Sequence, residues 1–256
     1  MTNSVRERNL ILNIYYELKE VRYFYVPDAA NAGELPQDEA THAIRVLRMQ
    51  PQDEIFLMDG CGTFYRAEIT LVTSKKCMYR ITESMPQQRA WKSRIHLAIA
   101  PTKMMERIEW MAEKATEIGF DELSFLSCRF SERTKLRVDR VEKIVVSAVK
   151  QSHKAWMPKV NDMQDIKSFL REPREGRKYI CHCYSEFEKK DLFTELTATD
   201  GDITILVGPE GDFSVDEVQL AIDNGYESVS LGTSRLRTET AGLMAVTMAN
   251  LTARIV

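Results

Sequence analysis

The sequence has few cysteines and no long apolar run. Its five cysteines are an odd, scattered set among 256 residues and show no C-x-x-C spacing, which argues against a disulfide scaffold or a zinc ribbon. No stretch approaches the roughly 18 apolar residues of a membrane span, and the short apolar stretch near the N-terminus lacks the features of a secretory signal. We therefore expect a soluble, cytoplasmic protein without a bound metal.

Two common phosphate-binding motifs are also missing. The sequence contains no G-x-x-x-x-G-K-[ST], and the spacing of Gly208 and Gly211 does not meet the G-x-G-x-x-G pattern. An ordinary nucleotide site is therefore not expected.

The last quarter of the chain instead contains two strand-like runs that each lead into a glycine-bearing loop and a helix start. The first strand-like run, 203–207, leads into the loop at 208–214. The second run, 229–232, leads into the segment at 235–242. Glycine lacks a Cβ and proline restricts the local turn, so such loops can bring main chain against a ligand. The pair predicts one small-molecule pocket, walled largely by backbone groups, beyond the carboxyl ends of the strands.

Hydrophobic periodicity divides the chain into two regions. Residues 22 to about 85 show short β-like runs, a hairpin signal at 59–62 and one helix at about 42–49, which is typical of a small, mostly antiparallel barrel. A linker is predicted at 86–89. Beyond it, strands alternate with helices, which indicates an α/β domain with a mainly parallel sheet. The elements expected there are strands at 95–100, 123–126, 179–183 and 203–207, and helices at 105–118 and 139–151.

Charge is unevenly distributed along the chain. The formal net charge is −3, yet residues 88–160 hold 15 Lys and Arg against 9 Asp and Glu, while both flanks are acidic. A concentrated basic stripe is the footprint expected for contact with a phosphate backbone. A solvated helix face explains the same pattern equally well.

Three segments of the last quarter carry a family signature: VGPEGDFS at 207–214, SLG at 230–232 and RLRTETA at 235–241. Together they resemble the RsmE family of 16S ribosomal RNA methyltransferases, which belongs to the SPOUT superfamily. The similarity covers about residues 22–256, with further matches at 22–26, 42–49, 103–119 and 132–134.

The resemblance implies a fold and an activity. It implies a PUA-like β-barrel at 22–88, which binds RNA, and a SPOUT α/β domain at 89–256 with a deep trefoil knot at about 180–256. Family members are homodimers that bind S-adenosylmethionine in the knot and methylate N3 of a uridine in the decoding region of the small-subunit rRNA. Methylation of another rRNA or tRNA site, and a non-catalytic RNA-binding role, remain as alternatives.

The resemblance also implies site residues by motif position. The cofactor pocket would be lined by Gly208, Pro209, Glu210, Gly211, Leu231, Gly232, Leu236, Arg237, Thr238 and Ala241. The residues expected to contact RNA are Arg22, His42, Arg45, Arg48, Arg129, Arg133, Lys135 and Lys154. For His42, which could stack on a base, a solvent-facing or packed histidine is the more ordinary explanation.

Methylation at uracil N3 requires the loss of one proton, which a carboxylate or histidine can remove while an arginine stabilises the anion. The candidates are Glu239, Glu210, Glu186 and His182 for proton removal, and Arg237, Arg235 and Arg133 for the anion. We favour Arg237 and Glu239 because both lie where the chain enters the last helix. Glu239 is also explained as a first-turn carboxylate favoured by the helix dipole.

Residues 1–21 precede the region of family similarity. Their apolar residues recur at helical spacing, which predicts an amphipathic helix that packs on the body or on a partner. Alternatively, the start codon was chosen too early and Val21 stands at the natural initiator.

Overall fold

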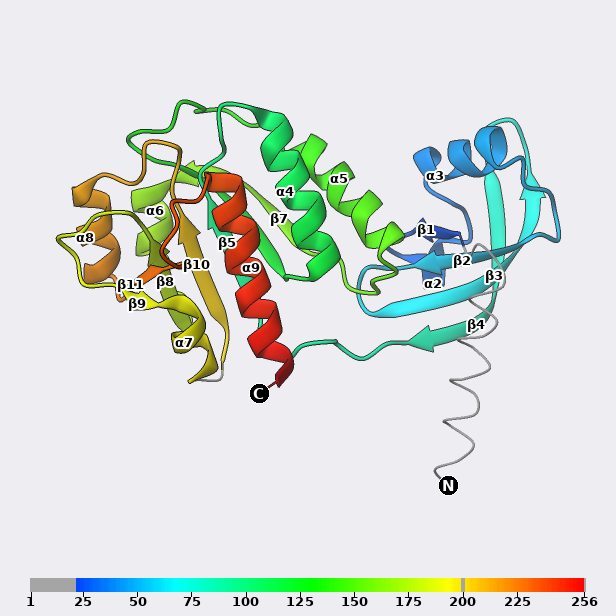
Figure 1. The fold of residues 1–256 in the computed structure, drawn as a ribbon. Helices are drawn as coiled ribbons and strands as arrows, with labels where there is room; N and C mark the ends of the chain where they lie inside the picture. The colour runs from blue at the N-terminus through cyan, green and yellow to red at the C-terminus, as the bar shows by residue number, and fades with distance from the viewer. Residues whose placement is uncertain (1–21, 199–200, 256) are drawn as a thin grey trace, which may run out of the picture. The chain divides into compact units, whose positions relative to one another are not determined.

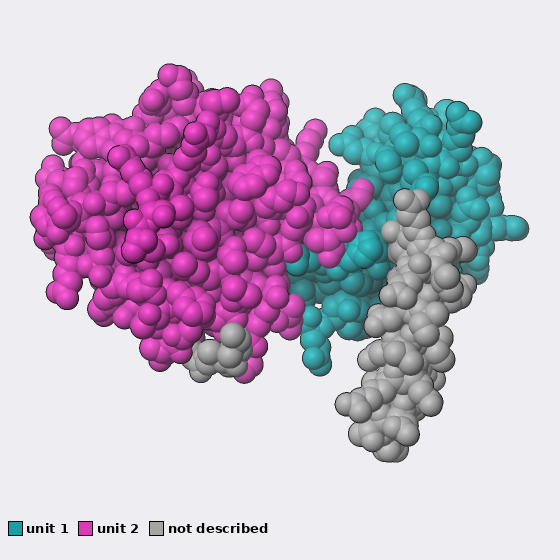
Figure 2. All heavy atoms as spheres, in the orientation of Figure 1, with its two compact units in different colours: residues 1–88, 153–156 teal, residues 89–152, 157–256 magenta. Residues whose placement is uncertain are grey.

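The computed structural model describes residues 22–198 and 201–255, and the helix expected within residues 1–21 lies outside these ranges. The chain divides into two compact units (Figure 2). Unit 1 contains the residues up to 88 together with 153–156, and unit 2 contains 89–152 and 157–256. The inclusion of 153–156 in unit 1 was not anticipated from the sequence.

Unit 1 is built on a four-stranded sheet in the order β1-β2-β3-β4. The strands are β1 (Tyr23–Tyr25), β2 (Glu54–Met58), β3 (Thr63–Val72) and β4 (Cys77–Pro86). β2, β3 and β4 pair antiparallel as expected, whereas β1 pairs parallel with β2, so the sheet is mixed. One face buries an apolar cluster that includes Phe24, Leu35, Ile55, Leu57, Ala67, Ile69, Cys77 and Tyr79.

The helical part of unit 1 begins and ends earlier than predicted. A short helix, α2 (Ala29–Ala32), is followed by α3 (Gln37–Thr41) and a π-helical turn, η1 (His42–Val46). The predicted helix over 42–49 was therefore wrong at both ends. Pro36 and the two acidic residues of the first turn were the signal for the earlier start. The helix ends before Arg48, which has a left-handed φ of 53°.

Unit 2 contains a seven-stranded sheet in the order β7-β6-β5-β10-β8-β11-β9, and every strand pair is parallel (Figure 1). The strands are β5 (Ile95–Ile99), β6 (Glu122–Ser127), β7 (Lys159–Asp165), β8 (Arg177–Cys181), β9 (Lys190–Asp191), β10 (Ile203–Val207) and β11 (Glu227–Ser230). The mainly parallel α/β sheet predicted from the sequence is therefore confirmed. The strand expected at 179–183 begins and ends two residues earlier.

Five helices of the described chain connect these strands, and a sixth, α9, follows the last strand, β11. They are α4 (Met105–Ile118), α5 (Val138–Gln151), α6 (Ile166–Arg171), α7 (Leu192–Thr197), α8 (Val215–Asp223) and α9 (Thr238–Ile255). α9 contacts β5 and β10 and packs against α4 and α7, whereas α6 contacts β6, β7 and α8 (Figure 1). None of the helices in the described ranges combines the length and apolar character needed to span a bilayer.

A buried histidine lies within the sheet of unit 2. His96, on β5, is 9% exposed, and its Nε2 lies 2.8 Å from Ser124 Oγ, which also accepts a hydrogen bond from Asn161. Burial lowers the pKa of His96 to about 4, aided by Arg174 and opposed by the nearby Glu122. The imidazole is therefore neutral at neutral pH.

The buried His96 should make the stability of unit 2 depend on pH. The unfolded chain takes up a proton near pH 6.5, whereas the folded chain resists protonation until about pH 4. The free energy of unfolding should therefore fall as the pH drops through this window, by up to about 1.4 kcal/mol per pH unit. Urea unfolding at several pH values measures this slope. A His96→Gln variant with an unchanged slope would show that another group causes it.

Candidate functional site

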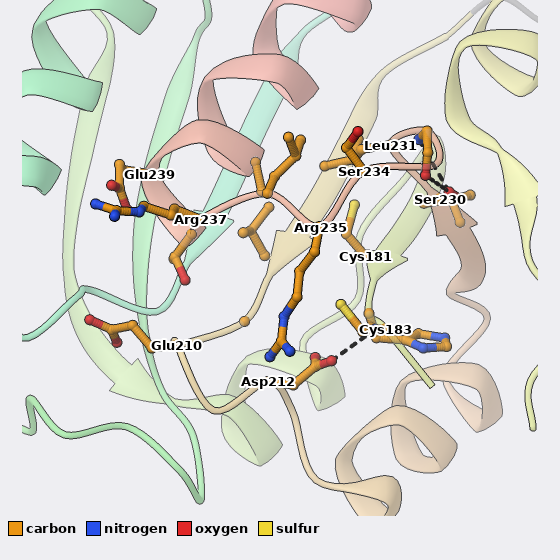
Figure 3. Close-up of a pocket in the computed structure, with 18 of the residues that line it drawn as sticks. Cys181, Cys183, Glu210, Asp212, Ser230, Leu231, Ser234, Arg235, Arg237 and Glu239 are labelled. Carbon is orange, nitrogen blue, oxygen red and sulfur yellow. Dashed lines mark hydrogen bonds between the residues drawn. The ribbon is translucent and has the colours of Figure 1, made fainter. Parts of the chain in front are cut away.

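A cavity of unit 2 lies where β8, β10 and β11 end (Figure 3). Its volume is about 720 Å³, within the range of pockets that hold small molecules. Both glycine loops contribute to its wall, as the sequence predicted. The lining consists of Arg107, Cys181, His182, Cys183, Lys189, Val207, Gly208, Pro209, Glu210, Asp212, Val229 and the residues from Ser230 to Glu239, together with Ala241.

The structure brings the predicted cofactor residues together around this cavity, with the exception of Gly211. A Cβ built on Gly211 would lie 3.0 Å from Cβ of Phe130, so the α-carbon of Gly211 faces Phe130. Gly211 does not line the cavity. The sequence could not show this, because Phe130 lies in a distant loop.

Local hydrogen bonds hold the first glycine loop. The amide of Asp212 donates to the carbonyl of Pro209 at 2.9 Å, and the Asp212 side chain accepts from the amide of Cys183 at 2.8 Å. Glu210 accepts from the amide of Lys103 at 2.9 Å. The loop is therefore tied to the two neighbouring loops that carry Cys183 and Lys103.

The helix after this loop begins with a capping box. The Ser214 hydroxyl accepts from the amide of Glu217, and the Glu217 carboxylate accepts from the amide of Ser214 at 2.7 Å. The other carboxylate oxygen of Glu217 accepts from the amide of Arg129 at 2.8 Å. Glu217, which is 4% exposed, thus connects the start of α8 to the loop that carries Arg129.

The second glycine loop is closed by Ser230 and Gly232. The Ser230 hydroxyl donates to the carbonyl of Gly232 at 2.8 Å and accepts from its amide at 3.1 Å. Gly232 has a φ of 115°, a conformation that side-chain-bearing residues rarely adopt. A Cβ built on Gly232 would have no atom within 4 Å apart from those of its chain neighbours. The backbone conformation alone, and not a close contact, therefore accounts for a glycine at this position.

Glu239 is, with His182, one of two cavity residues that have a buried polar side-chain atom without a hydrogen-bond partner in the described chain. It lies in the first turn of α9, is 7% exposed, and its Oε1 is 3.5 Å from Arg107 Nη1. Its Oε2 is buried and has no hydrogen-bond partner among the described residues. A buried carboxylate oxygen without a donor is costly, which indicates that a ligand supplies one. Arg107, from α4, was missed because helical spacing alone says nothing about distant partners.

Figure 3 shows how the other charged side chains of the cavity are arranged. Arg235 extends toward Asp212, while Arg237, Glu239 and Glu210 lie on the other side. Arg237 and Glu239 both line the cavity, and their catalytic roles stay a prediction. Glu186 and Arg133, two of the other candidates, are not part of the lining.

The 181–183 segment lines the cavity with uncharged groups. Nε2 of His182 lies 3.1 Å from Ser228 Oγ, and burial lowers the pKa of this imidazole. Burial raises the pKa of Cys181 to about 12 and also raises that of Cys183. Both cysteines are therefore thiols at neutral pH, and no group of three His, Cys, Asp or Glu side chains that could hold a metal occurs within 22–198 and 201–255.

The predicted RNA contacts are divided between the two units. In unit 1, His42, Arg45 and Arg48 are exposed at the end of the helical segment, Arg22 is exposed beside β1, and Lys154 belongs to the 153–156 segment. His42 also has Phe24 at a ring-centroid distance of 6.4 Å. Because Lys154 belongs to unit 1, the basic residues of 88–160 are divided between the two units.

In unit 2, the loop over 128–137 carries Arg129, Arg133 and Lys135. Arg129 and Lys135 are exposed. Arg133 donates to the carbonyls of Thr102 and Lys103, so it supports the backbone of a neighbouring loop while keeping its charge.

The chain is similar to known RNA methyltransferases along most of its length. A family model described as an RNA methyltransferase domain matches residues 89–250, and one described as an RNA methyltransferase PUA domain matches 35–77. A curated relative from Rickettsia conorii, ribosomal RNA small subunit methyltransferase E, is 29% identical over 85% of this chain and 89% of its own.

Solved structures show the same similarity. A probable rRNA-methyltransferase from Porphyromonas gingivalis is 40% identical, with a TM-score of 0.84 over 91% of this chain and 98% of its own. Ribosomal RNA small subunit methyltransferase E from Neisseria gonorrhoeae, bound to S-adenosyl methionine, is 27% identical. Its TM-score is 0.77, and the match covers 89% of this chain and 95% of its own.

Proposed function

Because the chain belongs to the RNA methyltransferase family whose model spans residues 89–250, we propose that it transfers a methyl group from S-adenosylmethionine to N3 of a uridine in the decoding region of 16S rRNA. The observation that carries this proposal is the cavity between the two glycine loops, with the orphaned Oε2 of Glu239 in its wall. The names of the relatives from Rickettsia conorii and Neisseria gonorrhoeae support the small-subunit rRNA as substrate.

The cavity residues fit this cofactor. Backbone groups of Gly208, Leu231 and Leu236 would hold the adenine and ribose, because these loops present main chain to the cavity. The bound cofactor supplies an electrophilic methyl group on a sulfonium. The protein therefore has to align the acceptor base, exclude water and manage one proton.

The charged side chains of the cavity act in the removal of the proton from uracil N3. Glu239 Oε2 is placed to accept this proton, while Arg107 orients the carboxylate through its contact with Oε1. Arg237, which lines the same part of the cavity, stabilises the negative charge that develops on the uracil oxygens. The deprotonated N3 would then receive the methyl group that the cofactor supplies, as the methyl–sulfur bond breaks and S-adenosylhomocysteine leaves.

We further propose that the protein is a homodimer that uses the exposed apolar face of α9 and α4. Met244 and Leu251 are 37% and 46% exposed and, seven residues apart on α9, lie on one side of the helix. Trp110 on the adjacent α4 is 45% exposed. Large apolar side chains gathered on packed neighbouring helices are typical of subunit interfaces.

The dimer proposal predicts the effect of a charge on this face. Leu251→Arg should shift the protein toward a monomer, because a buried unpaired charge opposes association. Light scattering after size-exclusion chromatography measures the mass. Leu71→Arg in unit 1 is the matched control, since Leu71 is also 46% exposed. Equal masses for both variants and the wild type would contradict the proposed interface.

The strand order supports a knot at about 180–256. β10 lies between β5 and β8, β11 lies between β8 and β9, and α9 then returns to pack on β5 and β10. The five free cysteines agree with a reducing cytoplasm, where ribosomal subunits are present.

The function is tested by cofactor binding and by mapping the methylated nucleotide. We expect calorimetry to show one S-adenosylmethionine site per chain. We expect mass mapping to show a new methyl group on a decoding-region uridine after incubation with unmethylated small subunits. Methylation of another rRNA or of tRNA would correct the substrate. Cofactor binding without transfer to any RNA would favour a binding protein, and absence of cofactor binding would overturn the proposal.

A further inference from the structure

Phe130 is a large aromatic residue on the surface of unit 2 that the proposed reaction does not use. Its side chain is 45% exposed, although it lies in a loop whose neighbour Cys128 is buried. We propose that the ring of Phe130 stacks on an unpaired base of the RNA substrate close to the methylated uridine. This inference rests on the proposed function, because it concerns how the same RNA is held.

The Phe130 loop is connected to the cofactor cavity through Gly211. The α-carbon of Gly211 faces Cβ of Phe130, and a Cβ there would come within 3.0 Å of it. Gly211 is next to Glu210 and Asp212, which line the cavity. A base stacked on Phe130 would therefore lie beside the mouth of the pocket in which the target uridine reacts.

The backbone around Phe130 is held in place by hydrogen bonds. The amide of Arg129 donates to the buried carboxylate of Glu217 at 2.8 Å. The amide of Ser131 donates to the carbonyl of Cys128, and the Ser131 hydroxyl accepts from the amide of Cys128. The ring is thus presented by a rigid turn, so little conformational entropy is lost when a base binds.

The charges around the ring match a nucleic acid. The loop over 128–137 contains Arg129, Arg133, Lys135 and Arg137 and the single acid Glu132, which is paired with Lys103. The guanidinium carbon of Arg129 lies 5.7 Å from the Phe130 ring centroid. Its ion pair with the exposed Asp216 is long, at 3.7 Å. An exposed aromatic ring beside a cation, on a loop rich in basic residues, is a common way for proteins to bind unpaired bases and their phosphates.

The experiment compares RNA affinity among variants of the full chain. The probe is a labelled single-stranded oligouridylate, and fluorescence anisotropy gives the Kd at several salt concentrations. Phe130→Ala and Phe130→Leu should raise the Kd about 5- to 100-fold, because stacking needs an aromatic ring. Phe130→Tyr should bind like the wild type. The dependence of the Kd on salt concentration should be the same in the variants as in the wild type, because the contacts with the phosphates remain.

Phe193→Ala is the matched control, because Phe193 is 42% exposed and lies outside this loop. It should leave the Kd unchanged, and all variants should bind S-adenosylmethionine like the wild type. The proposal is overturned if the wild type does not bind the oligonucleotide, or if Phe130→Leu binds as tightly as the wild type. It is also overturned if Phe130→Ala impairs only reactions with intact subunits, which would indicate a ribosomal protein. Absence of methyl transfer by the wild type, with Phe130-dependent binding intact, would refute only the proposed function.

Discussion

Replacing Glu239 by glutamine is expected to lower the rate of methyl transfer by about 10²- to 10⁴-fold, the usual contribution of a general base. Glutamine has nearly the same shape, so the cavity and its affinity for S-adenosylmethionine should be retained. Single-turnover transfer of a labelled methyl group measures the rate, and calorimetry measures cofactor affinity. The rate of the variant should rise with pH, by up to about tenfold per unit, because hydroxide then removes the N3 proton.

Two comparisons separate this role from a structural one. If Glu239 only supports the start of α9, Glu239→Gln should lower the free energy of unfolding while leaving a rate that does not recover at high pH. Glu106→Gln, also in the first turn of a helix, is the control and should react like the wild type. A Glu239→Gln enzyme with more than a tenth of the wild-type rate would exclude the carboxylate as the base.

The second large effect is expected at Gly232. A Gly232→Val variant should bind S-adenosylmethionine about 5- to 150-fold more weakly, because valine does not tolerate the φ of 115° and the loop must change shape. Since Gly232 lines the cavity, this change distorts the main chain that holds the cofactor. Calorimetric titration measures the Kd.

Gly201→Val is a close control for the Gly232 variant. Gly201 has a φ of 113° and, like Gly232, open space where a Cβ would be, but it does not line the cavity. Both variants should lower the free energy of unfolding by about 1–3 kcal/mol. Only Gly232→Val should weaken cofactor binding. Equal cofactor affinities for the two variants would show that the second glycine loop does not hold the cofactor.

Elements with strong local signals were predicted well from the sequence. The helix at 105–118 and the strand at 203–207 match the observed bounds, because apolar spacing and adjacent turn residues mark their ends. The helix predicted at 42–49 was misplaced because its end depends on a π-helical turn and on the left-handed Arg48. No simple sequence pattern encodes either feature. β7, α6, β9 and α7 were missed, because polar residues interrupt the apolar alternation of β7 and the other three elements are short.

The two loops of the pocket were recognisable in advance because glycine, proline and a capping box act on their immediate neighbours along the chain. Their meeting around one cavity also followed from the rule that parallel strands end at the same edge of a sheet. The approach of Arg107 to Glu239, and the position of Gly211 against Phe130, depend on contacts between segments far apart in the sequence. Local propensities carry no information about such contacts, because they arise only when α4, the 128–137 loop and α9 pack on the same sheet.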